Sequence, residues 1–180
     1  LRAGLRYGLT PAVHADELTP TGGAELAADV GAASASHLVH TSGRGIRMMA
    51  RKNVVAVLLP CSSFTMMSDK YADARRMIEA GVPVALATDY NPNCLTENMQ
   101  AIVTLAAYKL RLTAAEAITA ATINAAHAIR RNKKIGSIEP GKQADIVVLN
   151  APSHRFLTYH LWVNLVDTVI KKGEIKHQEA

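Results

Sequence analysis

Short apolar runs that end in polar residues recur four times in the first half of the chain. Each run has the length of a buried strand and gives way to a turn or to polar side chains. In chain order the runs are Leu9–His14, Ala33–Leu38, Val54–Leu59 and Pro83–Ala87. Because the loops after the strands of a parallel α/β barrel form its ligand-binding face, we expect the polar residues after these runs to share one face.

Segments with helical spacing or composition separate the runs. The predicted helices cover Ala24–Gly31, Gly43–Lys52, Tyr71–Ala80, Thr96–Leu110 and Thr113–Ile129, with a helix tail at residues 1–8 and a loop at residues 61–70. Thr113 and Glu116 match a capping box at the start of the last helix. Four strand–helix units predict an α/β protein with a parallel sheet and right-handed crossovers. Since a complete (β/α)8 TIM-like barrel takes about 250 residues, the chain is expected to hold half of one.

The sequence changes character after Ile135. Residues 136–143 are rich in turn formers, Ala144–Leu149 is an apolar strand, and Lys172-Gly173 suggests the turn of a terminal hairpin. Short strands without helices between them predict a small β appendage. We therefore expect two parts, a half-barrel at residues 1–134 and a β-rich segment of a composite small domain at residues 135–180.

Composition narrows the class of protein. The chain of 180 residues is 49% hydrophobic and 19% charged, which suits one well-buried core or a domain with a small appendage. Its apolar runs are far shorter than the roughly 20 residues of a membrane helix, and its first eight residues lack the pattern of a signal peptide. A cytoplasmic protein without a membrane partner is expected. Cys61 and Cys94 stand alone in separate segments and are predicted to be reduced thiols.

The formal net charge of +5 comes from scattered basic residues, with small clusters at residues 130–134 and 171–172. Aromatic residues make up only 4% of the chain, so the stacking platforms of a single-strand nucleic-acid binder are missing. We interpret the clusters as solvated surface and predict no nucleic-acid partner. A modest positive field would help to attract an anionic small-molecule substrate.

Imidazole and carboxylate side chains lie at or just after the ends of three of the four apolar runs. His14 ends the first run and Glu17 lies just after it, His37 is the second-last residue of the second run, and Asp89 follows the fourth. A single aspartate after a strand more often caps a helix or shapes an Asx turn, and a single histidine more often has a structural role than a ligand role. The repetition of these residue types at successive strand ends favours a site, and the ligand chemistry suits zinc or iron.

Two groups of motifs resemble known families. Thr122–Ala128 and Gly136–Leu149 resemble the closing signature of the amidohydrolase superfamily. His14–Glu17, Gly22–Ala28 and Ala87–Pro92 are similar to the narrower imidazolonepropionase family, which opens the imidazolone ring in histidine degradation to give N-formimidoyl-L-glutamate. The resemblance extends over almost the whole chain, but only over the C-terminal part of the family's protein. It implies barrel strands five to eight.

The resemblance also implies roles for individual residues. His14 matches the metal-binding histidine of the fifth barrel strand, and Asp89 matches the metal-binding and catalytic aspartate after the eighth, with one Zn²⁺ or Fe²⁺/Fe³⁺ per site. Glu17 matches the glutamate that contacts the imidazolone ring, and His37 matches the histidine that assists the attacking water. The substrate carboxylate would lie at a loop that contains Asn91, Asn93 and Cys94. In the family pattern, a glycine and a small hydroxyl residue occupy the positions of Asn93 and Cys94.

The family supplies two further metal ligands from a His-x-His pair, which occurs nowhere in these 180 residues. We therefore expect a fragment that is inactive alone, from a full-length protein that forms a homodimer. Two other interpretations stay open: another amidohydrolase, such as a purine or pyrimidine deaminase, and a non-catalytic half-barrel that dimerises through its sheet edges. The turn at Asp89–Pro92 and the glycine pair at Gly22-Gly23 favour imidazolonepropionase.

Overall fold

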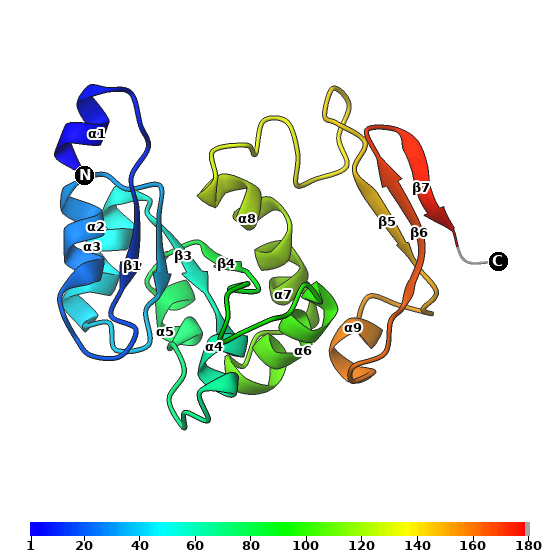
Figure 1. The fold of residues 1–180 in the computed structure, drawn as a ribbon, viewed down its shortest axis with the longest axis horizontal. Coiled ribbons are helices and arrows are strands. Elements are labelled where there is room, and N and C mark those ends of the chain that lie inside the picture. Colours follow the sequence, from blue (N-terminus) through cyan, green and yellow to red (C-terminus); the bar gives the residue numbers. More distant parts are fainter. Residues whose placement is uncertain (179–180) are drawn as a thin grey trace.

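The computed structural model describes residues 1–178 and contains two separate sheets (Figure 1). The first has four strands in sequence order, and every neighbouring pair is parallel. The strands are β1 (Ala12–Ala15), β2 (Ser34–His37), β3 (Val55–Leu58) and β4 (Val84–Leu86). The predicted α/β class with a parallel sheet is therefore confirmed. Residues 179–180, the last two of the predicted β-rich segment, lie outside the described residues.

Helices follow each strand of this sheet. α1 (Arg2–Arg6) precedes β1, and the helices after the strands are α2 (Gly23–Asp29), α3 (Gly43–Lys52), α4 (Pro60–Thr65), α5 (Ala74–Glu79) and α6 (Met99–Lys109). Large aliphatic side chains fill the space between sheet and helices, among them Leu38, Met49, Leu58, Met77 and Ile102, all at most 1% exposed. α3 has the predicted bounds, with Ser42 as a cap that accepts a hydrogen bond from Gly45 N.

One predicted loop is wrong. Residues 61–70 were expected to be irregular, but α4 occupies the start of this segment, and Pro60 lies in its first turn. Proline suits that position because its missing N–H has no partner in a first turn. The sequence from Cys61 to Thr65 lacks strong helix formers and a helical apolar period, so tertiary packing outweighs local propensity here. Ser62 and Ser63 are buried in this short helix.

The last predicted helix is also wrong in extent. The structure divides Thr113–Ile129 into α7 (Ala114–Ala121) and α8 (Ile123–Ala128), with a break at Thr122, where φ is −119° and ψ is −95°. The Thr122 hydroxyl donates to Ile118 O at 2.7 Å, a back-bond that bends helices. The predicted capping box of Thr113 and Glu116 is confirmed. After the break, Asn124 Nδ2 donates to Val84 O at 2.8 Å and fastens α8 to the start of β4.

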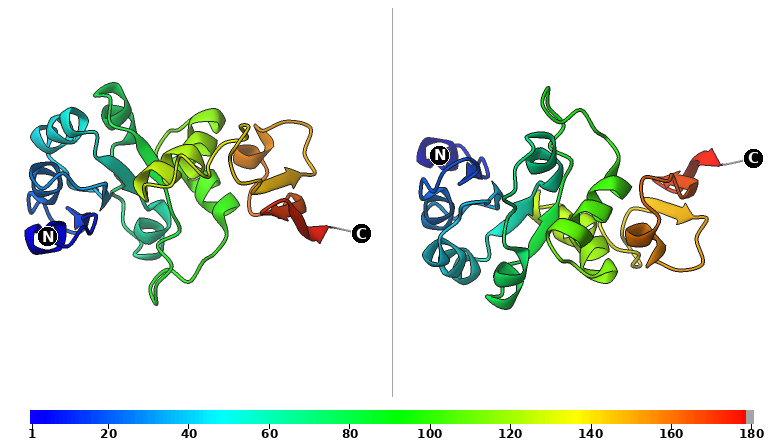
Figure 2. Two further views of the ribbon diagram at one scale, coloured as in Figure 1. Left: turned by 90° about the horizontal axis from the view of Figure 1, so that it is seen from above. Right: turned by 90° about the horizontal axis from the view of Figure 1, so that it is seen from below.

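The second sheet is antiparallel. It consists of β5 (Ile146–Leu149), β6 (Val166–Lys171) and β7 (Glu174–Gln178), and the predicted hairpin turn at Lys172-Gly173 is confirmed. A short helix that the sequence did not predict, α9 (Phe156–Tyr159), lies between β5 and β6. Figures 1 and 2 show the two sheets at opposite ends of the molecule, with α6, α7 and α8 between them.

α6 connects the two parts. Thr104 Oγ1 donates to Leu157 O at 2.9 Å. Gln100 donates from Nε2 to Asn164 Oδ1 and accepts from Leu165 N at Oε1. Several predicted ends are displaced by one to three residues: the first strand begins at Ala12 instead of Leu9, and α5 begins after its cap Asp73. Within residues 1–178, no helix combines the length and the apolar character that crossing a membrane requires.

Candidate functional site

His14, Glu17 and His37 lie together where β1 and β2 end. His37 Nε2 is 3.1 Å from His14 Nδ1, and His37 Nδ1 is 3.4 Å from Glu17 Oε1. The ring centroids of the two histidines are 5.0 Å apart. One potential ligand atom from each of the three residues lies within 4.8 Å of the other two, close enough for all three to face one metal ion.

The strand register explains this grouping. Ala15 pairs with His37 across the parallel ladder, so the carboxyl ends of β1 and β2 are level. The chain then turns sharply: φ is +50° at Asp16, +71° at His37 and +62° at Leu38. Each of these left-handed conformations costs a non-glycine residue about 1 to 3 kcal/mol, so surrounding contacts must hold them. Such strain clusters at functional sites, which agrees with the position of the three ligand-type residues.

Asp16 is the residue whose role the sequence did not indicate. Its side chain is buried and accepts hydrogen bonds from the segment that starts α2 and from Thr41 in the loop after β2. Burial alone would raise the pKa of this carboxyl, but the bonds from Gly23, Ala24, Thr41 and Thr21 hold it below its usual value. Only the glycine-rich start of a helix seven residues later could have indicated a capping role from the sequence.

Electrostatics keep His37 neutral. Burial holds the pKa of His37 below its usual range, against the charges of Glu17 and Asp89, while the His14 imidazole lowers it further. At neutral pH, His37 is therefore an uncharged imidazole with one nitrogen able to donate and one able to accept. His14 is exposed, whereas Glu17 is half-buried.

Asp89 lies near these residues but outside their compact group. It follows β4 with φ of +58° and is half-buried. Its charge opposes the lowering of the His37 pKa and also acts on Cys61. The role of His14 and Asp89 as paired metal ligands therefore stays a prediction.

The loop after Asp89 is closed by its own hydrogen bonds. Asn91 Oδ1 accepts from Asn93 N at 2.8 Å and from Cys94 N at 3.2 Å. Cys94 is 1% exposed, and its thiol donates to Thr88 O at 3.3 Å. Asn93 is exposed. Substrate binding by Asn91, Asn93 and Cys94 stays a prediction, with the Asn93 side chain the most accessible of the three.

The two cysteines are free thiols, as predicted. Burial, the neighbouring Cys94 and the charge of Asp89 raise the pKa of Cys61 to about 12. The Cys61 thiol therefore stays protonated at neutral pH and is a poor nucleophile.

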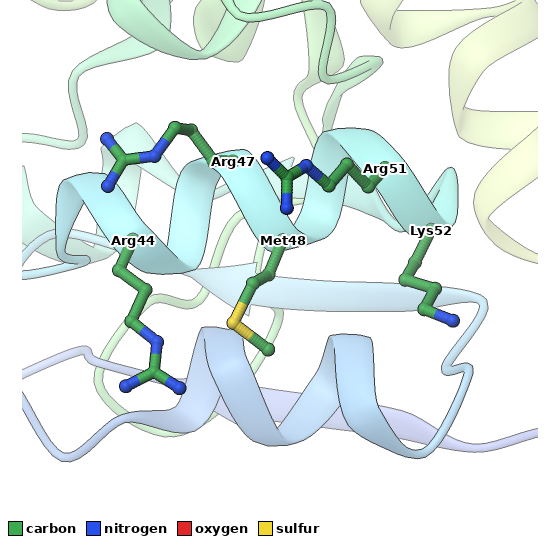
Figure 3. A pocket seen from close by; sticks show the side chains of 5 residues that line it. All are labelled: Arg44, Arg47, Met48, Arg51 and Lys52. Carbon is green, nitrogen blue, oxygen red and sulfur yellow. The ribbon is translucent and has the colours of Figure 1, made fainter.

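Two hollows lie apart from the imidazoles. One of about 1050 Å³ adjoins Ser36 and Val57 on the sheet and Ala87 just after β4, and it extends to α8 and β5. Another of about 470 Å³ lies over the exposed side of α3. Figure 3 shows the residues that line it, namely Arg44, Arg47, Met48, Arg51 and Lys52, with Arg44 and Met48 directed toward α2. Neither hollow is lined by His14, Glu17 or His37.

Comparison with known proteins gives the family. Residues 12–176 match the model of the Amidohydrolase family. The imidazolonepropionase of Alkaliphilus oremlandii is 53% identical over 97% of this chain, and that of Geobacillus kaustophilus is 54% identical over 97%. The chain spans only 42% and 41% of the lengths of these two relatives.

Solved structures of low sequence identity share the fold. An adenosine deaminase from Xanthomonas campestris with bound zinc is 24% identical with a TM-score of 0.80, over 98% of this chain and 47% of its own. A 5-methylcytosine deaminase from Klebsiella pneumoniae is 20% identical with a TM-score of 0.81, over 99% of this chain and 50% of its own. Together with the family match over nearly the whole sequence, this common fold leads to one conclusion: the chain belongs to the amidohydrolase family.

Proposed function

We propose that the chain is the C-terminal part of an imidazolonepropionase, which hydrolyses the cyclic amide of 4-imidazolone-5-propanoate to N-formimidoyl-L-glutamate. The observation that carries the proposal is the grouping of His14, Glu17 and His37 within 4.8 Å where two parallel strands end. Relatives of that name with more than half of their aligned residues identical support the substrate. In this proposal, β1 to β4 are barrel strands five to eight, residues 1–134 are the half-barrel, and residues 135–180 belong to the small domain.

The residues present fit a metal ion. His14 and Asp89 would hold one Zn²⁺ or Fe²⁺/Fe³⁺, and imidazole and carboxylate ligands suit both metals. When bound, such an ion lowers the pKa of a coordinated water to about 7 and so supplies a nucleophile for an unactivated amide near neutral pH. Glu17 and His37 lie close enough to act on that water or on the substrate.

The contacts of His37 favour one tautomer for both rings. The carboxylate of Glu17 lies 3.4 Å from His37 Nδ1 and favours a proton there. His37 Nε2 then accepts from His14 Nδ1 at 3.1 Å, which leaves a lone pair on His14 Nε2. Since His14 is exposed, that nitrogen is free to bind an ion.

The remaining residues act on protons and on the substrate. Glu17 would take a proton from the attacking water and pass it to the leaving nitrogen of the ring, and neutral His37, whose Nδ1 donates toward Glu17, would assist by orienting that carboxylate. Glu17 would also orient the imidazolone. The exposed Asn93 and the free amide NH₂ group of Asn91 would donate to the propionate carboxylate, while the buried Cys94 shapes the loop.

We further propose the partner, assembly and location of the full-length protein. The partner is a small anionic molecule and neither a nucleic acid nor a membrane, and the full-length protein is a homodimer in the cytoplasm. The modest positive charge of the chain is consistent with an anionic substrate.

The experiment is hydrolysis of 4-imidazolone-5-propanoate by this chain co-expressed with the N-terminal part of a full-length relative that carries the His-x-His pair. We expect formation of N-formimidoyl-L-glutamate, abolished by His14→Ala and by Asp89→Ala. The matched control is His154→Ala, which removes an exposed histidine far along the sequence and should keep full activity. Well-assembled protein without hydrolysis, or equal activity in His14→Ala and His154→Ala, would overturn the proposal.

A further inference from the structure

We propose that Asp16 is a positioning residue whose carboxylate fastens the loop after β2 to the loop after β1 and so holds His37 against His14 and Glu17. The importance of this geometry for catalysis rests on the proposed function, whereas the geometry itself can be tested without a substrate.

The carboxylate of Asp16 is fully engaged. The residue is 3% exposed, and Oδ1 accepts from Thr21 N at 2.9 Å, Thr21 Oγ1 at 3.2 Å and Gly23 N at 3.0 Å. Oδ2 accepts from Ala24 N and from Thr41 Oγ1, both at 3.1 Å. Four of these five bonds stay within residues 16–24. The fifth comes from Thr41, four residues beyond His37, and connects the two loops.

The backbone supports the same connection. Asp16 O accepts from His40 N at 2.8 Å, and Ala15 O accepts from Leu38 N at 2.9 Å. The segment that follows His37 is thus fastened at Leu38, His40 and Thr41 to two consecutive residues of the β1 end. These bonds follow His37 directly in the chain and restrain the backbone on its C-terminal side.

The turn at His37 needs such a restraint. His37 and Leu38 both have left-handed backbone conformations, with φ of +71° and +62°, which side chains with a Cβ rarely adopt. Two consecutive residues of this kind persist only when neighbouring contacts fix them. If the loop relaxed toward ordinary φ values, the His37 ring would turn away from the nitrogen of His14 and the carboxylate of Glu17.

A simple capping role does not account for these contacts. Asp73 caps α5 in the same chain with a single bond from Arg76 N at 3.1 Å, and its side chain is exposed. Capping therefore requires neither burial nor a bond from another loop. A helix cap does not need the bond from Thr41 to Asp16. The positioning of His37 does need it, because this bond connects the loop after His37 to the end of β1.

The test compares two substitutions that each delete one hydroxyl from the same carboxylate. Thr41→Val removes the side-chain bond between the loops and keeps the backbone bonds, whereas Thr21→Val removes a side-chain bond within the first loop and keeps the one from Thr21 N. In the metal-free chain we expect NOEs between the His14 and His37 ring protons in the parent and in Thr41→Ser and Thr21→Val, and their loss in Thr41→Val. Titration with Zn²⁺ should give affinity about tenfold weaker for Thr41→Val alone.

A second pair of variants keeps the proposal testable if Thr41→Val does not fold. Asp16→Asn should lose the ring NOEs while the same change at the cap Asp73→Asn keeps them, with circular dichroism verifying the helices of both. Ring NOEs and zinc affinity that respond equally to Thr41→Val and Thr21→Val, or to neither, would overturn the proposal and leave Asp16 a helix cap. The NOEs decide the matter even if the chain takes up no zinc, and neither readout depends on imidazolone.

Discussion

At the scale of single residues, the site can form because Gly23 has no side chain. Gly23 begins α2 directly against the end of β1, and a Cβ on it would lie 2.8 Å from both Cα and Cβ of Ala15. The same close approach lets Gly23 N donate to the Asp16 carboxylate. A larger residue would therefore push the helix away from the strand that carries His14.

Gly23→Ala tests this contact. We expect a loss of about 1 to 3 kcal/mol in the free energy of unfolding, because the extra methyl group must displace backbone. Urea denaturation measures the loss. Gly4→Ala is the control: its Cβ would make ordinary contacts of 3.6 Å with Leu9, and alanine favours the helix α1. Equal stability of Gly23→Ala and the parent chain would contradict the account.

The candidate site histidines are easier to predict from the sequence than the contacts that fix their positions. His14 and His37 could be selected because each lies at or beside the end of an apolar run, a local pattern. The role of Asp16 in connecting the two loops could not, since its partner Thr41 meets it only through the register of β1 with β2. The hydrogen bond from Cys94 N to Asn91 Oδ1 and the burial of Cys94 also depend on the folded structure and could not be predicted from the sequence.

At the scale of elements, packing against the sheet interrupts a segment whose helix propensity favours one continuous helix. The segment Thr113–Ile129 is rich in alanine and predicts one helix, yet the helix breaks at Thr122. The break allows Asn124 to reach Val84 O, and it places Ala128 against Val55 and Ala85 of the sheet. The strands and most helices could be predicted from periodicity, whereas this break and α4 depend on contacts that periodicity does not encode.

Asn124→Ala should destabilise the fold by about 1 to 3 kcal/mol, because the buried carbonyl of Val84 loses a donor. Chemical denaturation again gives the value. Asn150→Ala makes the same change at an exposed residue and should remain within about 0.5 kcal/mol of the parent. A loss of equal size in both variants would show that the bond to Val84 adds nothing.

The second sheet has an acid-sensitive connection. The hydrogen bond from Lys171 Nζ and that from Lys172 N lower the pKa of Asp145 from 3.8 to about 2. A carboxyl with a lowered folded-state pKa stabilises the fold above its unfolded pKa and loses this contribution as pH falls. We therefore expect the link between the start of β5 and the hairpin turn to persist above pH 3.8 and to fail between pH 3.8 and about 2.

The amide proton of Lys172 reports on this link by NMR. Its chemical shift should be constant from neutral pH down to pH 3.8 and should then change with a midpoint of about 2. In Asp145→Asn the change should be absent. A midpoint at 3.8 or higher would mean that the two lysines do not stabilise the Asp145 carboxylate.

At the scale of the whole molecule, the parallel sheet holds His14, Glu17 and His37 together where β1 and β2 end. α6 connects this part to the segment between β5 and β6 of the antiparallel part. The amidohydrolase match extends over both sheets, from residue 12 to residue 176. A catalytic metal site normally needs at least three protein ligands, and His14 and Asp89 are the two proposed for this chain. The proposed metal centre therefore depends on residues from the rest of the full-length protein.

Metal content is the measurement that tests this account most directly. The chain co-expressed with the His-x-His part of a relative is purified without chelator, and its zinc and iron are determined by mass spectrometry. We expect about one metal ion per assembled site in the parent and in His154→Ala, and a large loss in His14→Ala and in Asp89→Ala. Correctly assembled parent protein without metal, or His14→Ala protein with full metal content, would contradict the claim that the edge formed by β1 and β2 is a metal-dependent hydrolase site.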